Sequence, residues 1–351
     1  MRVAVPKIPL TPTLSHTGER GSSSLRRHNT SPQLRREARR KRRAGRESPW
    51  PHWLALATAG ATFLLILAGG LVTSTGAGLA VPDWPTTFGY TMFTYPWSKM
   101  VGGIFYEHSH RLIGSVVGLL TLSLAMSLWM VEARRWLRWL GVAALVFVIL
   151  QGVIGGLRVI WLADRLAILH GALAQAYFAL TAALVLFTSR EWRSEPSPPD
   201  RNAVLPLAGL SGLTTGAIYL QLVFGALLTH VGTRLDAHVG LAGLLVILVP
   251  TLATRILTRH ADRPGLVRPA SLLCGLLILQ LLLGLGAYVN RFTSIPLPFH
   301  ELLGLALPVS HRLTGGLLLV TSLVLTLRVS RLLGVPKAAA YRGETARRVP
   351  A

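Results

Sequence analysis

The sequence predicts an all-α polytopic membrane protein whose eight transmembrane helices form two pseudo-symmetric four-helix bundles. Of its 351 residues, 51% are hydrophobic and only 14% are charged, a balance typical of membrane proteins rather than of water-soluble domains. A helix that crosses a membrane needs about 20 mostly apolar residues. Eight apolar runs have this length: 53–72, 108–131, 138–157, 166–187, 204–228, 237–257, 269–288 and 309–329.

The connections between these runs alternate in charge. The connections after the second, fourth and sixth runs, and the tail after the eighth, are rich in arginine, whereas the other connections are poor in it. Because cytoplasmic loops carry an excess of Lys and Arg, this alternation places both termini in the cytoplasm. An even number of spans agrees with that placement. The arginine-rich stretches are 134–138, 190–201, 255–268 and 328–348.

The same pattern divides the chain into four parts. Residues 51–190 hold the first four runs and residues 200–330 the second four, while residues 331–351 form a cytoplasmic tail. Residues 1–50 carry much of the net charge of +22 and have little apolar periodicity, so we interpret them as a basic, disordered cytoplasmic tail. The basic run at 39–43 is also typical of nucleic-acid binding. A membrane span follows directly, however, so contact with anionic lipid or control of topology is favoured and no nucleic-acid partner is expected.

Four histidines lie at the same place in four different runs, near the predicted outer face. His110 and His311 are each followed by Arg-Leu-x-Gly, and both His170 and His238 are followed by a Gly and Leu-Ala in a second shared phrase. A single histidine at such a place is commonly a capping or interfacial residue. Ionisable side chains at membrane depth are costly and usually functional, so four at one depth favour a shared cofactor.

Haem is the cofactor that such histidines fit best. Neutral imidazole is a good axial ligand for haem iron, and helix bundles build cofactor sites from facing helices. Membrane cytochromes that stack two haems between one helix pair need two histidines about 13 residues apart on one helix, because each residue rises about 1.5 Å. Each run here supplies one histidine, so we expect two haems side by side, one in each half.

A second repeat accompanies the histidines. The third, fifth and seventh runs contain a glutamine followed four residues later by a glycine, and the first run ends in two glycines at the corresponding depth. Small residues there would allow close approach of a neighbouring helix or of a planar ligand. The residues are Gln151 and Gly155, Gln221 and Gly225, Gln280 and Gly284, and Gly69 with Gly70.

Glu107 distinguishes the first half from the second. It precedes His110 by three residues, which puts the two side chains on one helix face, whereas Pro308 holds the matching place before His311. Because only one of the two haems would have a carboxylate beside it, the pattern indicates one reactive site and one electron-transfer site. The alternative is an acid favoured by the helix macrodipole.

Other polar residues near the predicted outer face have two readings each. Arg111 and Arg312 follow their histidines and either pair with haem propionates or extend to the interface. The first outer loop, 73–85, contains glycines, prolines and Trp84, which are typical of an ordered cover over a site or of an interface anchor. We expect His230, in a later outer loop, to be a surface residue.

The chain resembles haem A synthases over residues 53–330. The resemblance is carried by Gly69-Gly70-Leu71-Val72-Thr73, by the loop with Gly76-x-Gly78 and Asp83-Trp84-Pro85, by Glu107-x-x-His110-Arg111, and by His170, His238 and His311-Arg312. Some bacterial members carry a cysteine pair in the first outer loop. The single cysteine here is Cys274, so no thiol or disulfide role applies to that loop.

The resemblance implies an oxidoreductase that converts haem O to haem A by oxidising a ring methyl to a formyl group through an alcohol. His110 and His170 would flank the iron of the substrate haem O, with Glu107 as the catalytic acid, and His238 and His311 would ligate a resident haem B that relays electrons. His108 leaves some ambiguity about which of two neighbouring histidines is the ligand. The implied setting is a bacterial cytoplasmic membrane, with membrane lipid around the bundle. Haem O synthase, the cytochrome c oxidase pathway and an unidentified electron donor would be partners, and a homo-oligomer is compatible with the sequence.

Other classes of protein fit less well. A bis-histidine haem B cytochrome that only transfers electrons is the main alternative, although Glu107 in one half argues against it. A transporter would have polar residues at mid-membrane, where these runs are almost uniformly apolar. A prenyltransferase would need acidic clusters that hold Mg²⁺ and diphosphate, and the sequence has no Asp-x-x-x-Asp pattern.

Overall fold

The computed structural model describes residues 48–194, 201–295 and 298–333. Of the two predicted tails, only residues 48–50 and 331–333 lie within this range, and the rest of both predictions lies outside the described residues. Residues 331–333 are the end of the last helix rather than part of a tail. Within the described ranges the chain is helical, apart from loops and an isolated β-bridge between Thr87 and Tyr90.

All eight predicted spans are confirmed as helices long and apolar enough to cross a membrane. Two short elements, η1 (Trp97–Lys99) and α6 (Arg190–Arg193), lie between them. The eight long helices are α2 (Trp50–Ser74), α3 (Gly102–Val131), α4 (Arg135–Trp161), α5 (Asp164–Thr188), α7 (Arg201–Val231), α8 (Leu235–Arg259), α9 (Pro264–Phe292) and α10 (His300–Leu333).

The helices are longer than the apolar runs that predicted them. α10 begins at His300, nine residues before its predicted start, and continues through Pro308. α3 begins at Gly102 and includes Glu107 and His108, both of which are buried. Helical hydrogen bonding continues past the apolar runs because a backbone group left unpaired near a membrane is costly. His110 and His311 therefore lie about two and three turns into their helices, deeper than the first turn that the sequence suggested.

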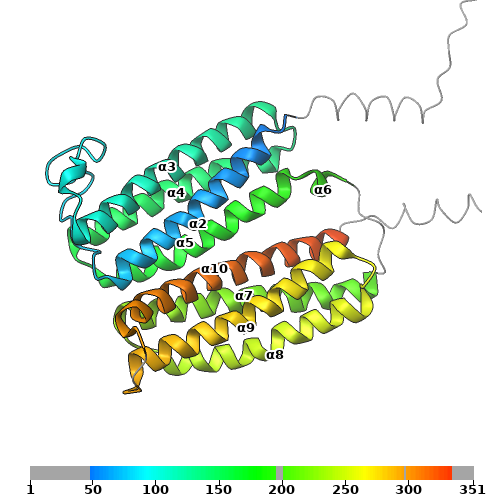
Figure 1. Cartoon of the computed structure of the whole chain (residues 1–351). Helices are drawn as coiled ribbons and strands as arrows, with labels where there is room; N and C mark the ends of the chain where they lie inside the picture. The colour runs from blue at the N-terminus through cyan, green and yellow to red at the C-terminus, as the bar shows by residue number, and fades with distance from the viewer. Residues whose placement is uncertain (1–47, 195–200, 296–297, 334–351) are drawn as a thin grey trace, which may run out of the picture. The chain divides into compact units, whose positions relative to one another are not determined.

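The helices pack in two groups of four (Figure 1). In the first group, α2 and α4 each contact both α3 and α5; in the second, α7 and α9 each contact both α8 and α10. The groups meet where α10 contacts α2 and α5 and where α5 contacts α7. The division of the chain into two separate halves and the pseudo-symmetry between them stay predictions.

Each group has its own apolar interior. Leu124, Leu128, Leu137 and Leu184 are fully buried in the first, and a second cluster is built around Leu252, Ile256, Leu273 and Leu325. Because lipid is as apolar as leucine, such contacts stabilise the bundle through close packing rather than through the hydrophobic effect. Gly141 on α4 illustrates this, since a Cβ there would lie 2.8 Å from Leu128 Cδ1.

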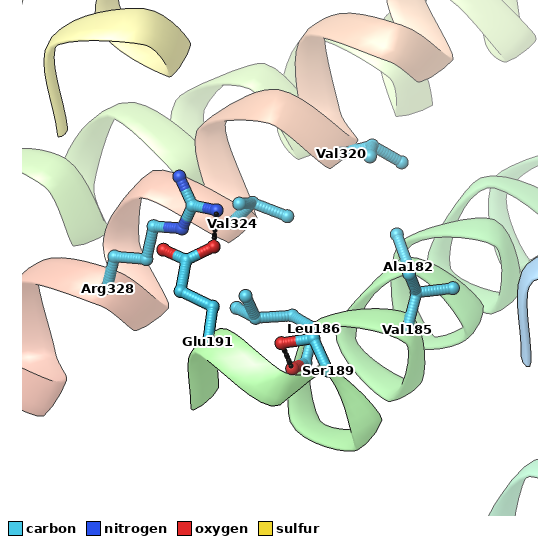
Figure 2. Close-up of a pocket in the computed structure, with 8 residues that line it drawn as sticks. All are labelled: Ala182, Val185, Leu186, Ser189, Glu191, Val320, Val324 and Arg328. Carbon is cyan, nitrogen blue, oxygen red and sulfur yellow. Dashed lines mark hydrogen bonds and ion pairs between the residues drawn. The ribbon is translucent and has the colours of Figure 1, made fainter. Parts of the chain in front are cut away.

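A shallow groove joins the two groups at the α6 end of the bundle. Figure 2 shows Ala182, Val185 and Leu186 of α5 facing Val320 and Val324 of α10 across a cavity of about 270 Å³. At its mouth, Arg328 Nη2 donates to Glu191 Oε2 at 2.8 Å. The Glu191 side chain is 56% exposed, so this ion pair contributes little stability. It does tie α6 of the first group to α10 of the second.

Candidate functional site

The four histidines come together as two pairs at the end of the bundle where α3, α5, α8 and α10 begin. His110 of α3 faces His170 of α5, with ring centres 6.4 Å apart and ring planes 80° apart. His238 of α8 faces His311 of α10, with ring centres 6.2 Å apart and planes 65° apart. Each four-helix group therefore contains one pair, built from its second and fourth long helices.

This spacing fits a metal shared by two opposed imidazoles. Metal–imidazole bonds are about 2 Å long, so two rings that bind one metal from opposite sides have centres about 6 Å apart. Both pairs have this separation, and all four rings are only partly exposed. An iron porphyrin brings four equatorial nitrogen ligands and takes two axial ones, which is the number that each pair supplies.

Every one of the four rings lies against a glycine of the preceding helix. A Cβ added at Gly69 would lie 3.0 Å from Cε1 of His110, and the corresponding distance for Gly284 and His311 is 2.9 Å. The values are 3.0 Å for Gly155 with His170 and 3.3 Å for Gly225 with His238. The repeated glycines thus make room for an imidazole, a more specific role than the close helix or ligand approach expected from sequence.

The glycines also orient the rings. For Gly69, Gly155 and Gly284, the added Cβ would lie closer to Nδ1 of the histidine than to Nε2, for example 3.3 Å against 3.8 Å at Gly284. Nε2 is therefore the nitrogen that points away from the glycine. A histidine whose Nδ1 faces a backbone carbonyl presents the lone pair of Nε2 to a metal.

His311 shows the Nδ1 side of this arrangement, while its Nε2 accepts from a glutamine amide that a metal would have to displace. His311 Nδ1 lies 3.1 Å from the backbone oxygen of Gln280, and the Gln280 side-chain amide lies 3.2 Å from His311 Nε2. A consistent assignment is that Nδ1–H donates to the carbonyl and that Nε2 accepts from the amide. The backbones of Leu65, Gln151 and Gln221 interact with the other three rings at the same register.

The Nδ1 atoms of His110, His170 and His238 are nevertheless buried and too poorly aligned with these backbone groups to form a hydrogen bond. Of the four Nδ1 atoms, that of His311 is the one with a hydrogen bond. The repeated glutamines support the other two helices differently: the amide of Gln151 donates to the backbone oxygen of His170 at 3.1 Å, and that of Gln221 to the backbone oxygen of His238 at 2.9 Å.

The connection between α2 and α3, residues 75–101, is an ordered segment that we call the strap (cyan in Figure 1). Its main anchor is Arg111 of α3, whose guanidinium donates to the backbone oxygens of Val81, Asp83 and Thr86 at 2.7–3.0 Å. The side chain of Arg111 is only 9% exposed. Arg111 therefore has protein partners, and its pairing with a haem propionate stays a prediction.

Glu107 belongs to the same network. Its Oε1 accepts from Arg111 Nη2 at 2.8 Å and its Oε2 accepts from the backbone N–H of Val81 at 2.9 Å, with 5% of the side chain exposed. A buried ion pair with hydrogen bonds on both partners is costly to break. The carboxylate predicted to be catalytic thus also fixes the strap next to the first pair.

The ambiguity between His108 and His110 has a clear geometric answer. His108 is 1% exposed and points to the strap, where its Nδ1 lies 3.1 Å from Thr87 Oγ1 and its ring centre 5.1 Å from that of Tyr95. His110 instead faces His170. His108 supports the strap, and His110 is the member of the histidine pair.

Trp84 closes the strap over α4. A Cβ added at Gly156 would lie 2.2 Å from Trp84 Cδ2, so the indole is packed directly on the helix backbone. The strap therefore contacts both α3 and α4 as an ordered segment, and its role as a cover over the site stays a prediction. The connection between α9 and α10 runs only from Thr293 to Phe299, so among the described residues the strap is a feature of the first group alone.

Asp83 shapes the turn of the strap and gives it a defined acid response. Burial alone would raise the pKa of Asp83, but hydrogen bonds from the Gly89 N–H, the Thr86 hydroxyl and the Phe88 N–H outweigh it and lower the pKa to about 2. A carboxylate with a lowered folded-state pKa contributes stability above its ordinary pKa, here 3.8, and loses it as the pH falls toward 2.

We therefore expect the strap to stay protected at pH 4 and to open as the pH approaches 2. Pepsin cleavage of the detergent-solubilised protein within residues 83–90, relative to cleavage elsewhere, measures this directly. Asp83→Asn should be cleaved faster than the parent chain already at pH 4. Equal strap cleavage of both proteins at pH 4 would contradict the role given to Asp83.

Two basic residues near the histidine pairs, Arg158 and His230, were not predicted to be part of the site. Arg158, in the last turn of α4, interacts electrostatically with His110 and His170. His230, expected in an outer loop, lies in the last turn of α7 and is half-buried. The available signal for Arg158 was its place just after the third apolar run, where arginines are scarce. Arg312 also reaches the first group, because its Nη1 donates to Gly70 O at 3.2 Å.

The fold and these pairs define the class: a multi-pass helical membrane protein with two paired-histidine sites inside its bundle. Residues 52–241 match the family model COX15-CtaA, described as cytochrome oxidase assembly protein. The match covers more than half of the chain, and the chain belongs to this family. It includes the strap, His110, His170 and His238 and ends before His311.

Curated relatives agree with the resemblance seen in the sequence. The chain is 31% identical over 137 residues to the haem A synthase of Geobacillus kaustophilus, a match that covers 38% of this chain and 42% of that protein. It is 30% identical over 174 residues to the haem A synthase of an Exiguobacterium species, covering 48% and 54%, and 27% identical over 188 residues to that of Shouchella clausii, covering 52% and 60%. The matches thus span about half the length of these relatives.

Proposed function

We propose that this protein is a haem A synthase that oxidises a ring methyl of haem O to a formyl group by way of a hydroxymethyl stage, giving haem A for a terminal oxidase. The observation that carries the proposal is the presence of two histidine pairs with metal-spanning separation. Among the residues that the structure describes, only the His110–His170 pair has an acid and a strap beside it. Such asymmetry suits one reacting site and one relay site. The names of the relatives point the same way.

In this proposal His110 and His170 bind the iron of the substrate haem O, and His238 and His311 bind a resident haem B. The bound haem supplies the iron and the electron relay that the oxidation needs. The protein packs each histidine imidazole against a glycine of the preceding helix. The strap excludes water from the first pair, and the Glu107 carboxylate lies near that pair. That carboxylate accepts from Arg111 and from the Val81 N–H, which hold it in one position. Its negative charge, partly offset by Arg111, can stabilise positive charge developing on the substrate.

The setting follows from the charge pattern of the loops. Both termini would face the cytoplasm of a bacterium and both haem sites would lie near the outer face of its cytoplasmic membrane. Haem O reaches the first pair from the lipid, which suits its apolar tail. A haem O synthase would supply it, an electron donor still to be identified would reduce the relay site, and assembly of cytochrome c oxidase would consume the product.

The experiment that tests this function is haem extraction from membranes of cells that express the chain with a haem O synthase. Haem A or its hydroxymethyl precursor should appear only when this chain is present. Haem B in the purified protein with haem O unconverted, in cells with working electron donors, would overturn the proposal in favour of a bis-histidine cytochrome that only transfers electrons. The nearly equal spacing of the two pairs is the observation that favours that second function.

The assignment of His110 over His108 has its own test. We expect His110→Ala to lose the low-spin, six-coordinate spectrum of a porphyrin at the first pair, because an axial ligand is gone. His108→Ala should keep that spectrum and lose strap protection. Loss of the low-spin spectrum in His108→Ala, with His110→Ala unchanged, would reverse the assignment.

A further inference from the structure

Two guanidinium groups and an imidazole lie near the two histidine pairs. They come from three helices and from both four-helix groups: Arg158 from α4, His230 from α7 and Arg312 from α10. Neither Arg158 nor His230 belongs to a histidine pair. Because the two arginines carry its positive charge, we call these three residues the cationic cluster.

Arg312 links the two pairs through neighbouring residues. It follows His311 of the second pair, and its Nη1 donates at 3.2 Å to the backbone oxygen of Gly70. Gly70 in turn follows Gly69, the glycine that seats His110 of the first pair. A Cβ at Gly70 would lie 3.2 Å from Arg312 Nη1, so the guanidinium rests on the α2 backbone at the level of both sites.

Arg158 lies under the strap beside the first pair. A Cβ added at Gly78 of the strap would lie 2.5 Å from its Nη2 and 3.1 Å from its Nη1, so the guanidinium is packed against the backbone of the strap. Its charge acts on His110 and His170. Among the described residues, Arg158 takes part in no ion pair.

His230 connects these two arginines. It interacts electrostatically with both Arg158 and Arg312, and also with His170. The acid that acts on it is Asp164 in the first turn of α5, which is exposed. Like charges that gather near a membrane raise the energy of the fold unless an anion offsets them. One exposed carboxylate is a weak offset for two guanidinium groups.

We propose that the cationic cluster binds the two carboxylate side chains of the porphyrin held between His110 and His170, and thereby sets the rotation of that porphyrin about its histidine–iron axis. This inference rests on the proposed function. Two axial ligands leave a porphyrin free to rotate, yet oxidation of one particular methyl requires one rotational position. The carboxylates lie on one edge of the ring, so binding them on the Arg158 side fixes which methyl faces the reacting position.

The test compares iron protoporphyrin IX with its dimethyl ester, which has the same ring without the two charges. Both are titrated into the full chain carrying His311→Ala, so that the low-spin Soret band reports the first pair. The acid should bind at least about tenfold more tightly than the ester, the equivalent of one charge-assisted hydrogen bond. Arg158→Gln and, independently, His230→Gln should each reduce this preference severalfold.

Arg165→Gln is the matched control, because Arg165 lies at the same end of the bundle on α5 and is exposed. It should keep the full preference for the acid. Each variant is also prepared in a second background, His170→Ala, in which the His238–His311 pair is intact. In that background the low-spin spectrum of the second pair shows that the chain has folded.

The possible outcomes distinguish failure of the carboxylate-binding proposal from failure of the proposed haem A synthase function. If neither porphyrin gives a low-spin spectrum at the first pair of a folded chain, the proposed function fails. If acid and ester bind equally with low-spin spectra, or if the preference survives in both Arg158→Gln and His230→Gln, the haem site stands and the carboxylate assignment is overturned.

Discussion

Gly284→Ala is expected to release haem from the second histidine pair. The added methyl would lie 2.9 Å from His311 Cε1, closer than carbon atoms approach, and the imidazole is the part that can move. Overpacking of this kind costs about 1–3 kcal/mol, and every 1.4 kcal/mol is about tenfold in affinity. The affinity of this pair for haem should therefore fall by about tenfold to a hundredfold, measured as haem per protein and as the low-spin spectrum.

The chain offers two internal comparisons for this variant. Gly275 lies on the same helix with nothing within 4 Å of an added Cβ, so Gly275→Ala should keep the haem and, since alanine is the better helix former, slightly stabilise α9. Gly225→Ala, with 3.3 Å to His238 Cε1, should lose less haem than Gly284→Ala. Full haem content in Gly284→Ala would show that the glycine does not determine the position of the ring.

The contrast between these glycines shows what sequence can and cannot predict about the site. The glutamine–glycine repeat identified a close approach in three helices, and the four histidines identified the residues that needed explaining. Which atom approaches each glycine depends on how far one helix is shifted along its neighbour. That shift is set by side-chain packing across helices, which the apolar periodicity of a single run does not contain.

The fold was predictable for a different reason. A membrane requires each span to satisfy its own backbone hydrogen bonds, so length and hydropathy alone identify α2 to α10. The starts of α3 and α10 were predicted too late because Glu107 and Pro308 interrupt the apolar pattern. Glu107 and His108 are retained in α3 because Val81, Thr87 and Arg111 give them partners, and such partners are invisible in a hydropathy profile.

The partners of the arginines were the least predictable part of the site. Arg111 and Arg312 follow their histidines in the same phrase, and the same two interpretations, pairing with a propionate or extension to the interface, applied to both. In the structure Arg111 binds three strap carbonyls, whereas Arg312 reaches α2 of the other four-helix group. The difference arises because only the first group has a strap. Identical local phrases therefore take different roles when the loop beside them differs.

Glu107→Ala is expected to abolish haem A formation while haem remains bound at the second pair. The substitution leaves Arg111 buried without its ion-pair partner and the Val81 N–H without an acceptor, a change that costs about 3–5 kcal/mol where a buried pair is broken. The strap should open, and product formation should fall by at least about a hundredfold, the scale of a lost catalytic carboxylate. Haem analysis of membranes and proteolysis of the strap measure the two effects separately.

Glu107→Gln separates the charge of Glu107 from its role as an anchor. The amide oxygen can still accept from the Val81 N–H, but the amide nitrogen then faces Arg111. We therefore expect the strap to be better protected than in Glu107→Ala and less than in the parent chain, while product formation stays lost because the negative charge is absent. Glu301→Gln is the matched control: Glu301 lies exposed in the first turn of α10, and its loss should change neither the strap nor the product. Normal haem A production by Glu107→Gln would assign Glu107 to positioning alone, and normal production by Glu107→Ala would remove it from the reaction altogether.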